Sequence, residues 1–319
     1  MNPERKKTIR SNQISKIYTL RLNGYPQKVL IEGKSKDLPV VITLHGGPGT
    51  PLPFSVGSRG MFPAFTDRFI MVYWDQLGCG INNHVIDDNF HISAFVGMTC
   101  DLIRKIRKRF PKNPIFIFST SWGSVLSALM PESMQKIVSG VVVSGQIVRN
   151  LFFNDETLSV LERSKIPQKK LEILKHTNPQ TASPKDVQLI SSCLMKYTNA
   201  YQNQNGKAKL APVIFELLTS PDYRFRDFKA ILINGYRHNT VIWHELLNLD
   251  LTDVLSRIRI PYVMVQGETD VVASTKNVAD LVNTSGNPHL QYHVVKNVGH
   301  FPNEEAMKLI LSELCRISQ

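Results

Sequence analysis

The feature that most constrains the fold is a series of short apolar runs, several of which are separated by segments of helical periodicity. The central runs are almost continuously apolar, which is typical of parallel strands that are covered on both faces. Alternation of such strands with helices predicts a doubly wound, mostly parallel α/β sheet. Gly24 and Pro26 suit a turn between the first two strands. The predicted strands lie at residues 16–22, 27–33, 40–44, 69–74, 115–118, 137–143, 262–266 and 290–295, and the clearest helical patterns lie at 92–110 and 304–317.

The middle of the chain has a different pattern. Residues 146–250 show mainly helical periodicity and contain no convincing strand. We therefore expect a sheet-containing core made of residues 1–145 and 251–319, with a helical insertion between them. The polar segment 198–209 is expected to be an exposed loop.

The formal net charge of +12 suggests an anionic partner as one interpretation. In the predicted helix 92–110, however, apolar residues recur at helical spacing, so the basic residues fall on the solvent face and near the helix C-terminus, where the dipole favours cations. No nucleic-acid motif accompanies the charge, and we predict no nucleic-acid partner. The densest basic cluster consists of Arg104, Lys105, Arg107, Lys108 and Arg109.

Other features of composition narrow the class of protein. No apolar run approaches the roughly 18 residues that span a membrane, and no signal-peptide core follows the basic N-terminal residues. The cysteines are scattered, without a CxxC pair, and no cluster of metal-ligating residues is visible. The sequence predicts a cytoplasmic protein with reduced thiols, without a membrane partner and without a metal or other cofactor.

One serine stands in the sequence context of an enzymatic nucleophile. Ser121 lies between the predicted strand 115–118 and a largely apolar helical stretch at 125–130. This strand–turn–helix context, with a small residue at Gly123, is typical of the nucleophile elbow of G-x-S-x-G enzymes. Ser119 stands where the first glycine is usual, and its small size permits the turn. The sharp turn is expected to expose the Ser121 hydroxyl above the sheet.

A serine nucleophile needs a base, which a third group orients. In the elbow fold these follow in the chain order serine, acid, histidine. Asp270 and His300 each follow one of the last two predicted strands, in that order. Glu268 is the competing carboxylate, and we prefer Asp270 because the chain turns away directly after it. The predicted catalytic residues are therefore Ser121, His300 and Asp270.

Residues 45–49, His-Gly-Gly-Pro-Gly, directly follow another predicted strand. Glycine lets the backbone approach a ligand closely, and a stiff loop with free N–H groups can stabilise a developing oxyanion. We expect an oxyanion hole formed by the N–H of Trp122 and that of Gly46 or Gly47. His45 is expected to order this loop rather than to transfer protons.

Together these passages resemble the α/β-hydrolase superfamily and, within it, the proline iminopeptidase-like serine peptidases. Residues 45–49 look like that family's oxyanion loop, and residues 121–123 look like its nucleophile turn. Residues 74–80, Trp-Asp-Gln-Leu-Gly-Cys-Gly, look like its Trp-Asp-Gln-x-Gly-x-Gly segment. Residues 267–270 and 299–300 are similar to the acid and base loops of the wider superfamily.

The resemblance implies an α/β-hydrolase fold in which residues 146–250 form a helical cap over the site. It also implies a serine hydrolase that removes N-terminal proline or another small residue from short peptides. Two alternatives stay open: an ester hydrolase that uses the same triad on small substrates, and a non-catalytic binding protein on the same scaffold. Family members hold the substrate's amino group with cap carboxylates, for which the candidates here are Glu156, Glu162, Glu216, Asp222 and Glu245.

Overall fold

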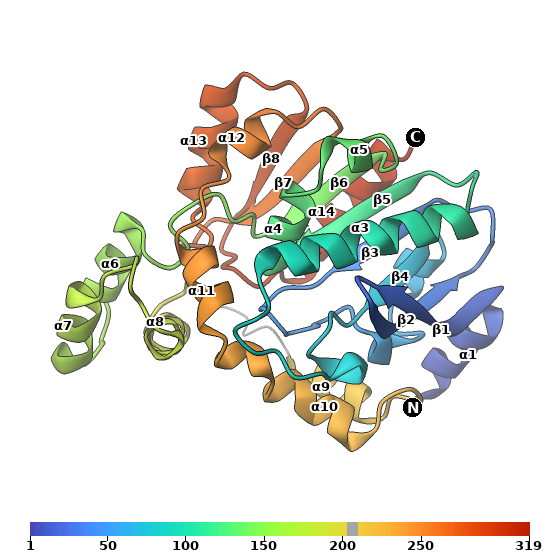
Figure 1. Ribbon diagram of the computed structural model, residues 1–319, viewed down its shortest axis with the longest axis horizontal. Coiled ribbons are helices and arrows are strands. Elements are labelled where there is room, and N and C mark those ends of the chain that lie inside the picture. The colour runs from blue at the N-terminus through green and yellow to red at the C-terminus, as the bar shows by residue number, and fades with distance from the viewer. Residues whose placement is uncertain (203–209) are drawn as a thin grey trace.

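The computed structural model describes residues 1–202 and 210–319. Its centre is an eight-stranded sheet in the order β1-β2-β4-β3-β5-β6-β7-β8 (Figure 1). From β4 to β8 all neighbouring strands are parallel, whereas β2 is antiparallel to both of its neighbours. The predicted mostly parallel sheet is thus confirmed. The strands are β1 (Ile14–Leu22), β2 (Tyr25–Gly33), β3 (Val40–Leu44), β4 (Ile70–Trp74), β5 (Ile115–Thr120), β6 (Gly140–Ser144), β7 (Tyr262–Gly267) and β8 (Leu290–Val295).

The central strands are apolar throughout because their side chains alternate between two buried layers. In β3, Val40, Ile42 and Leu44 belong to one apolar cluster and Val41 to the other. Helices α3, α4, α12 and α13 contribute to the first cluster and α14 to the second, and Figure 1 shows these two groups on opposite faces of the sheet. The helices outside residues 146–250 are α1 (Pro3–Ser11), α2 (Pro63–Thr66), α3 (Ile92–Arg109), α4 (Trp122–Ala128), α5 (Glu132–Gln135), α12 (Thr252–Ser256), α13 (Thr275–Ser285) and α14 (Glu304–Ile317).

Two predicted boundaries were wrong for local reasons. Strand β6 begins only at Gly140, because the backbone of Ile137 still hydrogen-bonds into the turn that follows α5. Pro26 lies within β2 rather than in the first turn. That turn is formed by Asn23 and Gly24, both at positive φ, as in the tightest hairpins.

The connection from β6 to β7 is helical in its described part. Within residues 146–202 and 210–250, the only β structure is an isolated bridge between Arg149 and Asp250. Next to this bridge, the backbone N–H of Leu251 donates to the carbonyl of Val148 at 2.8 Å. The connection therefore starts and ends side by side. Its helices between residues 146 and 250 are α6 (Asp155–Glu162), α7 (Gln168–His176), α8 (Pro184–Tyr197), α9 (Leu210–Leu218), α10 (Phe225–Leu232) and α11 (Thr240–Leu247).

The expectation of an exposed loop at 198–209 was wrong for the part that the structure describes. Ala200 and Tyr201 are buried, because this stretch packs against the loop that follows β8. Residues 203–209 lie outside the described residues.

The three arginines of the basic cluster on α3 make local contacts. Arg107 donates to carbonyls beyond the end of the helix, including that of Asn113 at 2.8 Å. Arg109 stacks over the ring of Tyr18 at 3.8 Å, and Arg104 pairs with Asp101. These contacts favour the interpretation of the cluster as a solvated helix face.

Cys79, Cys100, Cys193 and Cys315 all carry free thiols. In the described part of the chain, no helix has both the length and the apolar character needed to cross a membrane. No group of three or more His, Cys, Asp or Glu side chains in that part is arranged to hold a metal ion.

Candidate active site

The predicted nucleophile lies in a sharp turn between β5 and α4. Ser121 has φ 48° and ψ −117°, a conformation that non-glycine residues seldom adopt and that is associated with functional sites. Gly123 makes the turn possible, because a Cβ at this position would lie 2.1 Å from the carbonyl oxygen of Leu44. The hydroxyl of Ser119, at the usual glycine position, is buried and lies 3.0 Å from that of Ser127.

The structure brings Ser121, His300 and Asp270 together in one chain of hydrogen bonds. Ser121 Oγ donates to His300 Nε2, and His300 Nδ1 donates to Asp270 Oδ2, both at 2.8 Å. The other carboxylate oxygen, Oδ1, accepts the backbone N–H groups of Val272 and Ala273 at 2.9 and 3.0 Å. Only 2% of Asp270 and 8% of His300 is exposed. This is the arrangement of a nucleophile, a base and an orienting acid.

The competing carboxylate has a different role. Glu268 Oε2 accepts the backbone N–H of Asn297 at 2.8 Å, so it joins the loop after β7 to the loop after β8. The same two loops touch at Gly267, where a Cβ would lie 2.2 Å from the carbonyl oxygen of Gly299. This close packing sets Asp270 and His300 at a fixed separation.

His300 also contacts residues that the sequence analysis did not identify as part of the site. Its backbone N–H donates to the carbonyl of Ala200 at 2.7 Å, and the ring of Tyr201 stands edge-on to its imidazole, 5.7 Å away at 88°. On another side, a Cβ at Gly145 would lie 3.0 Å from His300 Cε1. The polar composition around Ala200 gave no signal of this packing.

The glycine loop lies against Ser121. A Cβ at Gly46 would be 3.2 Å from Ser121 Cβ. Gly47 has φ 121°, and a Cβ there would lie 2.5 Å from the backbone nitrogen of Gly49. Trp122 is the first residue of α4, where a backbone N–H has no acceptor within the helix. Two of the predicted oxyanion-hole residues, Gly46 and Trp122, therefore adjoin Ser121 from the glycine loop and from α4.

His45 is placed as expected for a residue that orders this loop. Its Nδ1 donates to the carbonyl of Gly46 at 2.8 Å, and its Nε2 accepts the backbone N–H of Gln76 at 2.9 Å. Burial lowers the pKa of His45 to about 4. The imidazole is therefore neutral near pH 7, and both of its nitrogens are already in use.

Asp75, in the Trp-Asp-Gln segment, also serves the scaffold. It accepts the backbone N–H groups of Val56 and Ile81, each at 2.9 Å, and the hydroxyl of Tyr223. Burial raises the pKa of Asp75 to about 6, although these hydrogen bonds oppose the shift.

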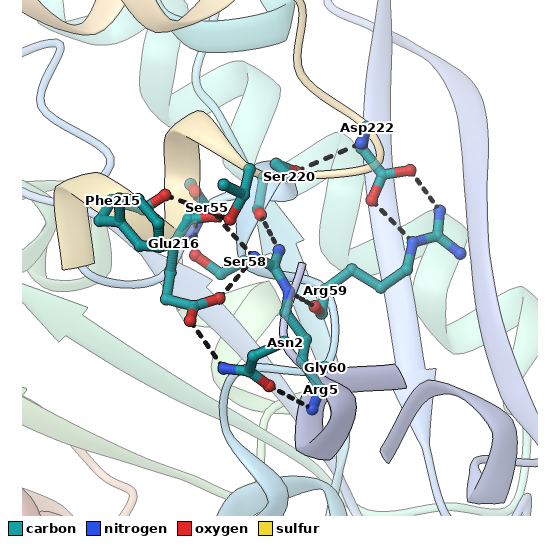
Figure 2. A network of polar contacts seen from close by, with 12 residues as sticks. Asn2, Arg5, Ser55, Ser58, Arg59, Gly60, Phe215, Glu216, Ser220 and Asp222 are labelled. Atoms are coloured by element: carbon teal, nitrogen blue, oxygen red, sulfur yellow. Dashed lines mark hydrogen bonds and ion pairs between the residues drawn. The ribbon is translucent and has the colours of Figure 1, made fainter. Parts of the chain in front are cut away.

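Two of the candidate cap carboxylates are paired with arginines (Figure 2). Glu216 accepts from Arg5 at 3.2 Å and from Asn2 at 2.7 Å. Asp222 is held by Arg59 in a two-pronged contact, at 2.7 and 2.8 Å. These pairs fasten α9 and the segment after it to the core, so both carboxylates have structural partners.

The other three candidates are engaged as well. Glu245 accepts the backbone N–H of Ile92 at 2.8 Å at the start of α3 and pairs with His91. Glu162 pairs with Lys175 at 2.9 Å. Glu156 accepts the hydroxyl of Ser274 at 2.7 Å. None of these partnerships is visible in the sequence, because the partners are distant along the chain or belong to another helix.

Comparison with known proteins agrees with this geometry. A family model described as "alpha/beta hydrolase fold" matches residues 39–306. The chain belongs to the α/β-hydrolase fold family. It is 24% identical over 325 residues to "Probable aminopeptidase YbaC" of Bacillus subtilis, an alignment that covers 99% of this chain and 98% of the relative. The predicted family resemblance is thus confirmed.

Solved structures show the same fold at lower identity. A proline iminopeptidase of Mycobacterium smegmatis superimposes with a TM-score of 0.61 at 17% identity, covering 95% of this α/β hydrolase and 99% of that chain. The carboxylesterase CesB of Bacillus subtilis superimposes with a TM-score of 0.58 at 13% identity, covering 98% and 95% of the two chains. The fold is therefore shared by proteins named as peptidases and as esterases.

Proposed function

We propose that this α/β hydrolase is a serine hydrolase that acts through an acyl-enzyme. The observation that supports it most strongly is the continuous hydrogen-bond chain from Ser121 through His300 to Asp270, beside the glycine loop. Ser121 attacks a carbonyl carbon while His300 takes its proton and passes it to the leaving group. The N–H of Trp122 and that of Gly46 or Gly47 stabilise the oxyanion. Water then hydrolyses the acyl-enzyme, with His300 as the base.

The favoured substrate is a short peptide with N-terminal proline or another small residue. Similarity to a protein named as a probable aminopeptidase extends along 99% of the chain and supports this assignment. In this proposal residues 146–250 form a cap that selects the substrate. A cytoplasmic location stays a prediction from the sequence.

A second candidate function is hydrolysis of small carboxylic esters. The five cap carboxylates considered for binding a substrate amine all have partners within the protein. Asp155, Glu156 and Glu268 line a cavity of about 640 Å³, but neither Ser121 nor His300 is among its lining residues. An ester without a free amine needs no such carboxylate, so this observation favours the alternative.

A substrate panel separates the two functions. Amino-acyl amides with a free amine, the same amides with an acetylated amine, and short-chain aryl esters would be compared by turnover. The aminopeptidase is expected to cleave only the free-amine amides efficiently. Hydrolysis of esters alone, with no dependence on a free amine, would exclude the peptidase and leave the esterase.

Replacement of the nucleophile tests the mechanism itself. Ser121→Ala should lower kcat by roughly 10⁴-fold or more and abolish labelling by a fluorophosphonate probe. Ser124→Ala is the matched control: its hydroxyl accepts the backbone N–H of Ile147 at 3.0 Å, so the variant should keep the label. Full turnover by Ser121→Ala would contradict the mechanism. A wild-type protein that neither turns over the panel nor takes the label would support a binding protein.

A further inference from the structure

A buried glutamine joins the two sides of the candidate oxyanion hole. Gln76 Oε1 accepts the indole N–H of Trp122 at 2.7 Å, and Gln76 Nε2 donates to the carbonyl oxygen of His45 at 3.2 Å. All three side chains are buried. One amide group therefore contacts both the nucleophile turn and the glycine loop.

The connection continues as far as the glycine beside the nucleophile. The backbone N–H of Gln76 donates to His45 Nε2, and His45 Nδ1 donates to the carbonyl of Gly46. Gly46 in turn packs against Ser121. The path from Trp122 to Gly46 thus consists of hydrogen bonds between buried groups that use both ends of the Gln76 amide.

This path lies beyond the end of the β3–β5 strand pairing, where the glycine loop and the turn at Ser121 begin. The last paired residues of β3 and β5 are Leu44 and Ser119. Beyond this pair, no backbone hydrogen bond joins residues 45–49 to residues 120–124, all of which the structure describes. The relative position of the two segments therefore depends on packing and on the side chain of Gln76, which comes from the loop after β4.

The chemistry of the contact requires an amide. The Trp122 indole needs an acceptor and the His45 carbonyl needs a donor, and a glutamine tip supplies both. Methionine has similar length but supplies no donor and only a weak acceptor. Such a replacement would leave the indole N–H and the carbonyl unpaired in a buried place, so the two segments would be free to move apart.

We propose that Gln76 is a positioning residue that fixes the spacing of the oxyanion-hole donors without touching the substrate. This inference rests on the acyl-enzyme function proposed above. An oxyanion hole acts on charge that develops in the transition state, and its donors must be held to within about 0.5 Å of their productive places. The loss of Gln76 should therefore affect kcat rather than KM.

The experiment compares Gln76→Met with a matched control elsewhere in the fold. In the control, Gln27→Met, the replaced side chain is also buried and also accepts a tryptophan indole N–H, that of Trp74 at 2.8 Å. We expect Gln76→Met to lower kcat about 10- to 100-fold, because one displaced oxyanion donor costs up to 10²–10³, with KM nearly unchanged. Affinity for a boronic acid transition-state analogue should fall by the same factor. Gln27→Met should keep kcat and the analogue affinity.

A second variant covers the case in which Gln76→Met does not fold. Trp122→Phe removes the indole donor but keeps the backbone N–H, and it should show the same loss of kcat and of analogue affinity. Unchanged kcat in a folded Gln76→Met, or an equal loss in Gln27→Met, would overturn the positioning role. If Ser121→Ala is inactive while both Gln76→Met and Trp122→Phe are fully active, only this inference fails. Activity of Ser121→Ala would remove the proposed function itself.

Discussion

Gly123 is the residue on which the geometry of the nucleophile turn depends most directly. A side chain there would meet the backbone of β3, which cannot rotate away as a flexible side chain can. Gly123→Ala should therefore lower the free energy of unfolding by more than about 3 kcal/mol and abolish labelling of Ser121. Urea unfolding and the fluorophosphonate probe measure the two effects.

Gly97 provides the control for that substitution. It lies in α3, and a Cβ at this position would be 3.7 Å from the nearest atom. Gly97→Ala should leave labelling intact and add up to about 1 kcal/mol of stability, because alanine favours the helix. Equal stability losses in the two variants would contradict this account of the turn.

The meeting of Ser121, Asp270 and His300 was predictable from the sequence, whereas the partners of the candidate cap carboxylates were not. Ser121, Asp270 and His300 each follow an apolar strand, so local patterns were enough to place them. The role of Glu216 depends on Arg5, which is 211 positions away, and no local pattern encodes such a pair. A substrate-binding carboxylate can be identified only after these partners are known.

Helix α1 shows how an element can be missed when it docks through polar contacts. Its only buried residue is Arg5, so the helix carries no apolar stripe. Asn2 at the N-cap followed by Pro3 is the one local signal of a helix start. By contrast, the strands and the helix 304–317 were predicted because apolar residues occupy their buried positions in a regular pattern.

Arg5 should contribute more to stability than its surface counterparts. Its guanidinium donates to the carbonyls of Gly57, Arg59 and Glu216 and to the Glu216 carboxylate (Figure 2). Arg5→Met leaves these acceptors unpaired and should cost roughly 2–4 kcal/mol of unfolding free energy. Hydrogen exchange should show lost protection in α1 and α9 first.

The exposed pair of Arg104 with Asp101 supplies the comparison. Arg104→Met should change stability by no more than about 0.5 kcal/mol, because an exposed ion pair is screened by water. Similar costs for Arg5→Met and Arg104→Met would show that α1 does not fasten α9 to the core.

The stability of the folded chain should depend on pH through the ionisation of His45. Its pKa falls from 6.5 to about 4 on burial, so between these values the unfolded chain binds more protons than the folded one. Stability contributed by neutral His45 is complete above pH 6.5 and declines as the pH falls to 4, by up to about 3 kcal/mol. Urea unfolding at pH 7, 5.5 and 4.5 would measure the decline.

The His45→Gln variant isolates this contribution. Burial raises the pKa of Glu32 to about 7 and that of Asp75 to about 6. These two shifts increase the stability of the folded chain as the pH falls, opposite to the effect of His45. They are present in both the variant and the wild type. The variant should therefore lose less stability than the wild type between pH 7 and 4.5. Identical slopes in the two proteins would refute the assignment of a neutral, buried His45.

The bridge between Arg149 and Asp250 joins the two positions at which the chain leaves the core and returns to it. The strands that lead to Ser121, Asp270 and His300 all lie outside the segment between these two positions. A replacement segment has to reproduce the carbonyl at Ala200 that accepts the His300 N–H, and the carboxylates of Glu216 and Asp222 that pair with core arginines. We expect a replacement that keeps these contacts to leave Ser121, His300 and Asp270 in place and, if the proposed function holds, to change the substrate preference alone.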